Sequence, residues 1–272
     1  MISSLTNPKV KYISALNKGT AKGRKNEIVI EGTHLVEEAL KSQKDGRSKL
    51  NIVFYTGRYS ESKEGKTLLG QLGKAGVELE EITEKVMSHL SEVETPQGVM
   101  ALASLSSPDY ADFFKQENPA VLILDGIQDP GNLGTIIRVA DAFGASGILM
   151  SDRTVNPNNP KVVRSTAGSV FNVGLARFRS LIVPLKDLRR RGIKIVATDA
   201  AGPKTVSQVD LKGPVGFIFG SEGQGIEEGI LKLADELVSI PMTGKVESLN
   251  VAVSASIVLY EMLRQRRGKG NG

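Results

Sequence analysis

The stretch GNLGTIIRVADAFGA, residues 131–145, combines an apolar helix face with an arginine that lies off that face. Asn132 is placed to be the N-cap of this predicted helix. Arg138 projects away from the apolar side, where a guanidinium could hold a phosphate or stabilise developing negative charge. The spacing equally allows a surface arginine paired with Asp141, and periodicity does not separate the two interpretations. The predicted buried face consists of Leu133, Ile136, Ile137, Ala140, Phe143 and Gly144.

A second candidate is the glycine-rich stretch GSEGQGIEEG, residues 220–229, which follows the apolar run VGFIF. Glycines after a strand let the backbone approach a ligand and present its amide groups. A tight turn from strand to helix explains the same glycines, and on this stretch alone we favour the turn. A nucleotide triphosphatase is disfavoured, because no Lys-Ser or Lys-Thr pair follows these glycines. The decoy SESKEGKTLL, residues 60–69, has Ser60 where a phosphate loop needs its first glycine.

Histidine and cysteine, the usual residues of zinc sites and of many nucleophilic couples, are scarce. The chain holds His34 and His89, no cysteine, and neither residue type beyond Met100. Disulfides are therefore excluded, and the part after Met100 has no candidates for a catalytic zinc site or a Ser-His couple. We predict chemistry without a metal.

The charge balance favours an acidic partner such as nucleic acid. The net charge is +5, and the first 26 residues carry six basic residues and no acid. Lys9, Lys11 and Arg24 of this segment are candidates for phosphate contacts, although a solvated, mobile arm explains the same composition. No apolar run reaches the roughly 18 residues of a membrane span, and the start lacks the apolar core of a secretory signal. We expect a cytoplasmic protein.

The order of apolar runs predicts an α/β protein with two domains, residues 1–105 and 119–268, joined by a linker at 106–118. In the second domain, runs alternate with helical stretches, which is typical of a parallel sheet. Residues 250–267 alternate like a strand, but their length favours a buried helix. Predicted strands cover residues 50–54, 77–82, 98–104, 121–125, 146–150, 193–199, 215–220 and 236–240.

Three segments in order resemble the motifs of one enzyme family. DGIQDPGNLGTIIRVADAFGA, GFIFGSEGQGI and IPMTGKVESLNVAVSASIVLYE are similar to the three motifs of the SpoU (TrmH-like) RNA 2′-O-ribose methyltransferases, in the SPOUT superfamily. EGTHLVEEAL and TPQGVMALA resemble that family's N-terminal substrate-binding domain, which looks like a ribosomal protein. The resemblance covers nearly the whole chain.

This resemblance implies a knotted (trefoil) parallel-sheet methyltransferase domain preceded by a small α/β substrate-binding domain. It also implies S-adenosyl-L-methionine as methyl donor, RNA as partner, with ribosomal RNA favoured, and a homodimer. By motif position the cofactor is held by Gly220, Ile240, Leu249 and Thr198. Arg164 is a substrate position. The reacting ribose is surrounded by Arg138, Asn132, Glu222, Ser248 and Asn250.

A ribose 2′-hydroxyl is a poor nucleophile, so the protein must align it with the methyl donor and help to remove one proton. A guanidinium stays protonated under ordinary conditions, so we prefer a role in which Arg138 holds the phosphate and stabilises the developing alkoxide. Glu222 is the candidate proton acceptor. The alternatives are the same reaction on transfer RNA, or a non-catalytic RNA-binding or ribosome-assembly protein with the same fold.

Overall fold

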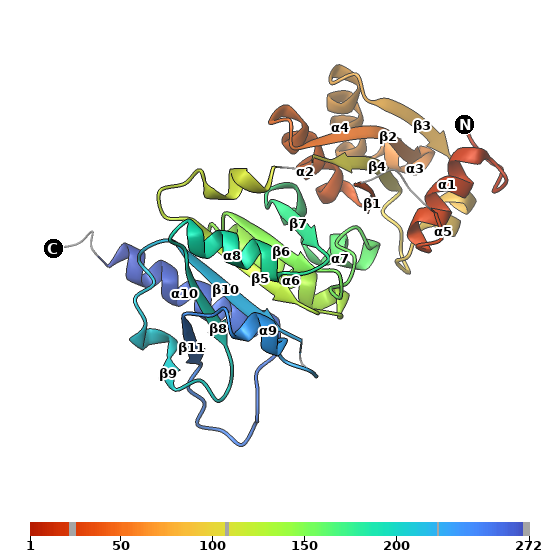
Figure 1. Ribbon diagram of the computed structural model, residues 1–272. Helices are drawn as coiled ribbons and strands as arrows, with labels where there is room; N and C mark the ends of the chain where they lie inside the picture. Colours follow the sequence, from red (N-terminus) through yellow and green to blue (C-terminus); the bar gives the residue numbers. More distant parts are fainter. Residues whose placement is uncertain (22–25, 107–108, 222, 269–272) are drawn as a thin grey trace. The chain divides into compact units, whose positions relative to one another are not determined.

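The chain forms two compact units in the computed structural model, which describes residues 1–21, 26–106, 109–221 and 223–268. Unit 1 comprises Met1–Ser106 together with Pro157–Asn172, and unit 2 comprises Ser107–Asn156 and Val173–Gly272 (Figure 1). The chain therefore passes between the units after Ser106, after Asn156 and after Asn172. None of the helices in these described ranges is long and apolar enough to cross a membrane.

Unit 1 is built around a mixed sheet of four strands in the order β1-β4-β2-β3. β4 pairs antiparallel with β1 and β2, whereas β2 and β3 are parallel. The helices and strands are α1 (Pro8–Asn17), β1 (Glu27–Glu31), α2 (Thr33–Lys44), β2 (Ser48–Thr56), α3 (Gly57–Glu61), α4 (Lys63–Lys74), β3 (Glu78–Ile82), α5 (Glu84–Leu90), β4 (Val99–Leu105), α7 (Pro160–Ser165) and the 3₁₀ helix η2 (Ser169–Phe171).

Part of the basic N-terminal segment, Pro8–Asn17, forms a helix. α1 begins at Pro8 after Asn7, whose side chain accepts a hydrogen bond from the Lys9 backbone amide. Pro is well tolerated at the first helical position, and Asn is a strong N-cap. Val10 and Ile13 are buried in the core of unit 1. The mobile-arm interpretation is therefore wrong for Pro8–Asn17.

The segment Pro157–Asn172 completes unit 1, although it lies in the middle of the sequence of unit 2. α7 packs against β1, and η2 packs against α2. The buried side chains of Val162, Val163, Val170 and Phe171 provide the apolar surface for this packing.

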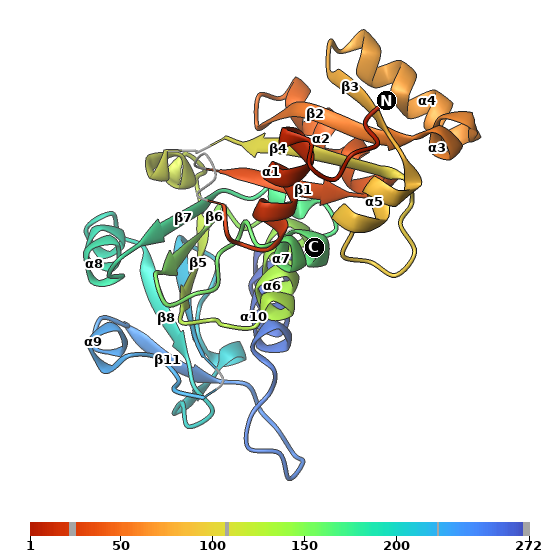
Figure 2. The ribbon, with the colours of Figure 1, turned by 90° about the vertical axis from the view of Figure 1, so that its right-hand side faces the viewer.

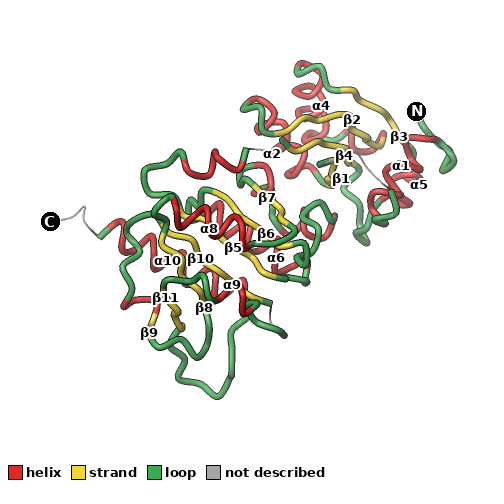
Figure 3. Tube along the Cα trace, viewed as in Figure 1, coloured by secondary structure: helices red, strands yellow, loops and turns green. Residues whose placement is uncertain are grey.

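Unit 2 is built around seven parallel strands in the order β7-β6-β5-β10-β8-β11-β9. Figure 3 shows the strands in yellow between red helices. The elements are the 3₁₀ helix η1 (Tyr110–Phe114), β5 (Ala120–Asp125), α6 (Pro130–Ala142), β6 (Gly147–Ser151), β7 (Leu175–Phe178), α8 (Ile182–Arg190), β8 (Lys194–Thr198), β9 (Lys204–Thr205), η3 (Val206–Gln208), β10 (Val215–Gly220), α9 (Glu228–Leu231), β11 (Glu236–Ser239) and α10 (Val251–Arg267).

Helices cover both faces of this sheet, which explains why its strands are almost continuously apolar. α6 and α10 lie on one face, and α8 and α9 on the other (Figure 2). α10 packs against both α6 and β10, so residues 250–267 form the buried helix rather than a strand. The parallel-sheet α/β fold is confirmed, and the knot stays a prediction.

Part of the predicted linker belongs to the core of unit 2. Phe113 in η1 is buried in one cluster with Val121, Ile123 and Leu149. A methyl group on Gly147 would lie 2.4 Å from the Phe113 ring, and one on Gly174 would lie 2.3 Å from it. These glycines therefore leave the space that the ring fills.

The strand order changes direction between β5 and β10. From β5 the chain adds β6 and β7 on one side, and β10 separates β5 from β8 on the other. In open parallel sheets, ligands bind beyond the carboxyl ends of the strands at such a switch point. Asp125 and Gly220 are the last residues of β5 and β10, and they lie opposite each other in register. The carboxyl edge at β5 and β10 is therefore the expected place for a ligand site.

Candidate active site

The helix that carries Arg138 begins two residues earlier than Asn132. Asp129 is the N-cap of α6, and its Oδ1 accepts a hydrogen bond of 2.8 Å from the backbone N–H of Asn132. Pro130 occupies the first helical position, where its fixed φ and missing N–H cost nothing. The prediction of Asn132 as N-cap is thus wrong, and the Asn132 side chain is not used to cap its own helix.

The Asn132 side chain instead contacts a residue 118 positions later in the sequence. Asn250 Nδ2 donates to Asn132 Oδ1 over 2.9 Å. Asn250 is itself the N-cap of α10, and its Oδ1 accepts from the backbone N–H groups of Ala252 and Val253 at 2.9 and 3.4 Å. The two asparagines were predicted from separate motifs, and the structure joins them through one hydrogen bond.

Arg138 lies on the exposed side of α6, one turn and a half along from Asn132. Leu133, Ile136, Ile137 and Ala140 are completely buried, as predicted for the opposite face. Gly144 lies beyond the helix end with φ +70, a conformation that favours glycine. Among the described residues, Arg138 forms no salt bridge, so a pair with Asp141 does not account for its position.

The four predicted cofactor residues are all half-buried, and three of them mark the carboxyl ends of adjacent strands. Gly220 ends β10, Thr198 ends β8, and Ile240 follows β11; β8 lies between β10 and β11. Thr198 Oγ1 donates to the Ile218 carbonyl oxygen over 2.9 Å, which links β8 to β10 at this edge. Leu249 directly precedes the Asn250 cap, at the end of the long loop 240–250.

The loop after β10 closes tightly over the backbone of Gly220. Ser221 and Gly225 exchange backbone hydrogen bonds of 2.9 and 3.2 Å, and Gln224 N–H donates to Ser221 Oγ. A methyl group on Gly220 would lie 2.3 Å from the carbonyl carbon of Gly225, so any other residue would push the loop away. The tight turn that the sequence favoured is present here, and the approach of this backbone to a ligand stays a prediction.

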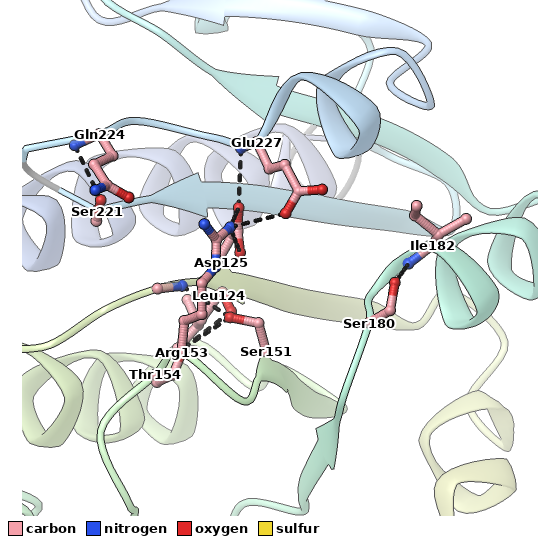
Figure 4. Close-up of polar contacts among 11 residues, drawn as sticks. Leu124, Asp125, Ser151, Arg153, Thr154, Ser180, Ile182, Ser221, Gln224 and Glu227 are labelled. Atoms are coloured by element: carbon pink, nitrogen blue, oxygen red, sulfur yellow. Dashed lines mark hydrogen bonds and ion pairs between the residues drawn. The ribbon is translucent and has the colours of Figure 1, made fainter.

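Sequence analysis did not identify an ionic cluster around one buried carboxylate at the same edge. Asp125 has a fully buried side chain and accepts hydrogen bonds from Arg153 Nη2 at 2.7 and 2.9 Å and from the Glu227 backbone N–H at 3.0 Å (Figure 4). Its hydrogen bond to Asp125 raises the pKa of Arg153. The sequence does contain one indication of this cluster. Asp125 ends the apolar run AVLILD, and a carboxylate buried at the end of such a strand needs a hydrogen-bonding or cationic partner.

The predicted substrate residues lie in unit 1, apart from Arg24, which falls outside the described residues. Lys9 Nζ pairs with Glu78 at 2.7 Å and with Glu80 at 3.1 Å, and these hydrogen bonds raise its pKa. Arg164 Nη1 pairs with Glu92 at 3.0 Å. Lys11 is exposed on α1. Two of the predicted substrate residues, Lys9 and Arg164, are therefore already paired with carboxylates.

The two remaining predicted site residues are Glu222 and Ser248. Glu222 is outside the described residues, and Ser248 is exposed in the loop before α10. Across the described ranges, no group of three or more His, Cys, Asp or Glu side chains is arranged to hold a metal ion.

Two family models match the chain. The model of the SpoU rRNA methylase family matches residues 119–260, and the model of the MRM3-like substrate binding domain matches residues 7–101. The 23S rRNA (guanosine(2553)-2′-O)-methyltransferase RlmP of Bacillus subtilis is 34% identical over 261 residues, which cover 96% of this chain and 98% of RlmP. The 23S rRNA (guanosine-2′-O-)-methyltransferase RlmB of Shewanella oneidensis is 34% identical over 89% of this chain and 99% of its own length.

Solved structures agree with these relatives. The AdoMet-bound rRNA methyltransferase of Sinorhizobium meliloti superposes with a TM-score of 0.81 at 32% identity, covering all of this chain (100%) and 98% of the other. The family match therefore extends over both units and over the motifs that carry Asn132, Gly220 and Asn250. The chain belongs to the SpoU rRNA methylase family.

Proposed function

We propose that the protein transfers the methyl group of S-adenosyl-L-methionine to a ribose 2′-hydroxyl of ribosomal RNA. The observation that carries the proposal is the hydrogen bond between Asn132 and Asn250, because it joins the third motif to the start of α6, the helix that carries the exposed Arg138. The relatives RlmP and RlmB are named as 2′-O-methyltransferases of guanosine in 23S rRNA, which supports ribosomal RNA as the substrate class.

The carboxyl edge of the unit 2 sheet fits the cofactor. Gly220, Gly223 and Gly225 provide backbone without side chains at this edge, and Ile240 and Leu249 add half-buried apolar surface. Such a mixture suits a nucleoside with a polar tail. When bound, S-adenosyl-L-methionine supplies a strongly electrophilic methyl group. We assign Gly220, Thr198, Ile240 and Leu249 to hold it.

On the ribose side, the residues must bind a phosphate, orient a hydroxyl and accept its proton. Arg138 is exposed and, within the described part of the chain, has no carboxylate partner, so its guanidinium is available for the phosphate and the developing alkoxide. The linked amides of Asn132 and Asn250, with Ser248, orient the hydroxyl. We assign Glu222 as the acceptor of the proton that the ribose hydroxyl loses.

Unit 1 is proposed to bind the RNA around the reacting nucleotide, as the match to a substrate-binding domain supports. Lys11 and Arg24 would contact phosphates directly. Lys9 and Arg164 would do so by exchanging Glu78, Glu80 and Glu92 for RNA phosphates. Contacts made this way should weaken steeply with salt.

We also propose a homodimer and a cytoplasmic location, where ribosomal RNA is available. Val253 and Tyr260 on α10 are 46% and 58% exposed and lie two helical turns apart on the same side. The Tyr260 ring contacts Phe143 edge-on, so the exposed surface extends toward α6. We expect Tyr260→Glu to lower the molar mass measured by analytical ultracentrifugation; an unchanged mass would argue against this surface.

The decisive experiment maps 2′-O-methyl sites in ribosomal and transfer RNA from cells with and without the gene. Complementation with Arg138→Ala is compared with Arg190→Ala, an exposed arginine on α8 whose side chain is 75% exposed. We expect one ribosomal site to disappear in the deletion, to return with Arg190→Ala and to stay absent with Arg138→Ala. A lost transfer RNA site, or unchanged methylation with an assembly defect, would favour one of the alternative functions.

A further inference from the structure

Asp125 lies where three loops of unit 2 meet. It ends β5, opposite Gly220 of β10, and its side chain is fully buried. The loop after β10 returns at Glu227, whose backbone N–H donates to Asp125 Oδ2. The loop after β6 contributes Arg153. One carboxylate thus connects the segments that follow β5, β6 and β10.

The contacts of Arg153 converge on one nitrogen. Nη2 lies 2.7 and 2.9 Å from the two oxygens of Asp125 and 3.1 Å from Glu227 Oε2. Figure 4 shows Arg153 and Glu227 approaching Asp125 from opposite sides. A buried carboxylate without its cation is strongly unfavourable, so loss of Arg153 should shift the Asp125 side chain or the loop that it holds.

A second set of hydrogen bonds fixes the loop after β6 to the loop after β5. Ser151 Oγ accepts from Gly126 N–H at 3.0 Å, Thr154 Oγ1 donates to the Leu124 carbonyl oxygen at 3.2 Å, and Val155 N–H donates to the Ile127 carbonyl oxygen at 2.8 Å. The loop after β5 leads directly into α6. Arg153 is therefore held rigidly relative to the helix that carries Asn132 and Arg138.

We propose that Asp125 and Arg153 are positioning residues that fix the Gly220–Glu227 loop relative to the first motif. The inference rests on the proposed function. Neither residue is assigned a contact with the reacting groups. Both act by fixing the position of the Gly220 backbone relative to the start of α6. A change of about 1 Å in such a relation is enough to lower a rate about a hundredfold.

The chain contains a matched control at the opposite edge of the same sheet. Asp235, just before β11, accepts from Arg189 Nη2 at 3.2 Å and from the Ile195 backbone N–H at 2.9 Å. The side chains of Arg153 and Arg189 are 47% and 48% exposed. Arg189→Ala therefore removes a similarly exposed arginine from an aspartate that is 33% exposed rather than fully buried and that lies away from the strands' carboxyl ends.

The experiment measures three quantities for wild type, Arg153→Ala, Arg153→Lys and Arg189→Ala in the full chain. They are the Kd for S-adenosyl-L-methionine by calorimetry, the single-turnover methylation rate of ribosomal RNA, and the Tm. We expect Arg153→Ala to raise the Kd or lower the rate about tenfold to a hundredfold. Arg189→Ala should stay within about twofold of wild type in both. Arg153→Lys should recover most of the loss, because one cationic nitrogen makes all three contacts.

The outcomes separate this inference from the proposed function. A wild-type chain that neither binds S-adenosyl-L-methionine nor methylates RNA contradicts the proposed function itself. An active wild type with equal Kd and rate in Arg153→Ala and Arg189→Ala overturns the positioning role. If Arg153→Ala does not fold, Glu227→Gln replaces it, since it keeps the backbone N–H to Asp125 and weakens only the ion pair with Arg153. A Kd and rate identical to wild type in Glu227→Gln would then overturn the role.

Discussion

Asn250 has two tasks in the structure, and a single substitution can separate them. Its Oδ1 caps α10, and its Nδ2 donates to Asn132. Serine caps helices as well as asparagine does, but its side chain is too short to reach Asn132. Asn250→Ser should therefore keep the cap and lose the bridge, whereas Asn250→Ala loses both.

The expected magnitudes follow from these contacts. Loss of the cap in Asn250→Ala should cost about 1 kcal/mol of unfolding free energy. The exposed hydrogen bond to Asn132 adds at most about 1 kcal/mol, so Asn250→Ser should lie within that of wild type. Both variants should lower the single-turnover methylation rate about tenfold to a hundredfold, about 1.4–2.7 kcal/mol, because the amide that orients the hydroxyl is lost.

A double-mutant cycle tests most directly whether the hydrogen bond between Asn132 and Asn250 matters for methyl transfer. If the hydrogen bond is what orients the ribose, Asn132→Ala combined with Asn250→Ser should be no slower than the slower single variant. Single-turnover rates with saturating RNA and cofactor, and urea unfolding for the free energies, are the measurements. A wild-type rate in Asn250→Ser, or effects that multiply in the double variant, would refute the assigned role of the bridge.

The remaining predictions concern the arginine, the glycine loop and acid stability. Arg138→Ala should change the unfolding free energy by no more than about 0.5 kcal/mol and slow turnover about a hundredfold. Arg138→Lys should recover little of the turnover, because an ammonium lacks the planar guanidinium fork. Wild-type turnover in Arg138→Ala would contradict this prediction. Gly220→Ala should weaken cofactor binding measured by calorimetry, since the added methyl meets the Gly225 backbone; an unchanged Kd would show that the loop moves freely. The hydrogen bond from Arg264 lowers the pKa of Glu261 below its ordinary 4.5, so its contribution is present above about pH 4.5 and is lost as the pH falls through the lower folded value. The stability difference between wild type and Glu261→Gln in urea unfolding should shrink accordingly on acidification, and a difference that grows would be inconsistent with this sign.

The apolar runs predicted the strands well because burial on both faces leaves a strong signal. All eight predicted strands are present. The sequence did not predict β1, which begins and ends with a glutamate, or the short strands β7 and β9. The helix at 250–267 was favoured correctly by its length. The N-cap of α6 was placed three residues too late because the pair Asp129–Pro130 is the stronger signal: aspartate caps the helix, and proline fixes its first turn.

Charge partners could not be read from the sequence. Lys9 and Glu78 are 69 residues apart, and Arg164 and Glu92 are 72 apart, so only the folded unit 1 brings them together. Likewise, only the folded unit 2 brings the Glu227 backbone N–H to the carboxylate of Asp125, 102 residues apart. Arg266, near the end of α10, donates to the carbonyl oxygens of Asn118, Leu211 and Gly213, which are likewise far from it in the sequence. Motif resemblance named the residues that we propose to face the substrate, and it did not name Asp125 or Arg153.

The threefold passage of the chain between the units constrains how substrate recognition can be exchanged between relatives. A chimera that replaces only residues 1–106 would place a foreign β1 and α2 against the native α7 and η2, whose Val162, Val163 and Phe171 are buried there. A functional graft must therefore carry two separate pieces, Met1–Ser106 and Pro157–Asn172, from the same donor. The sequences of the two units are consequently interleaved along the chain. A recombination event with a single crossover cannot replace all of unit 1 without also replacing part of unit 2.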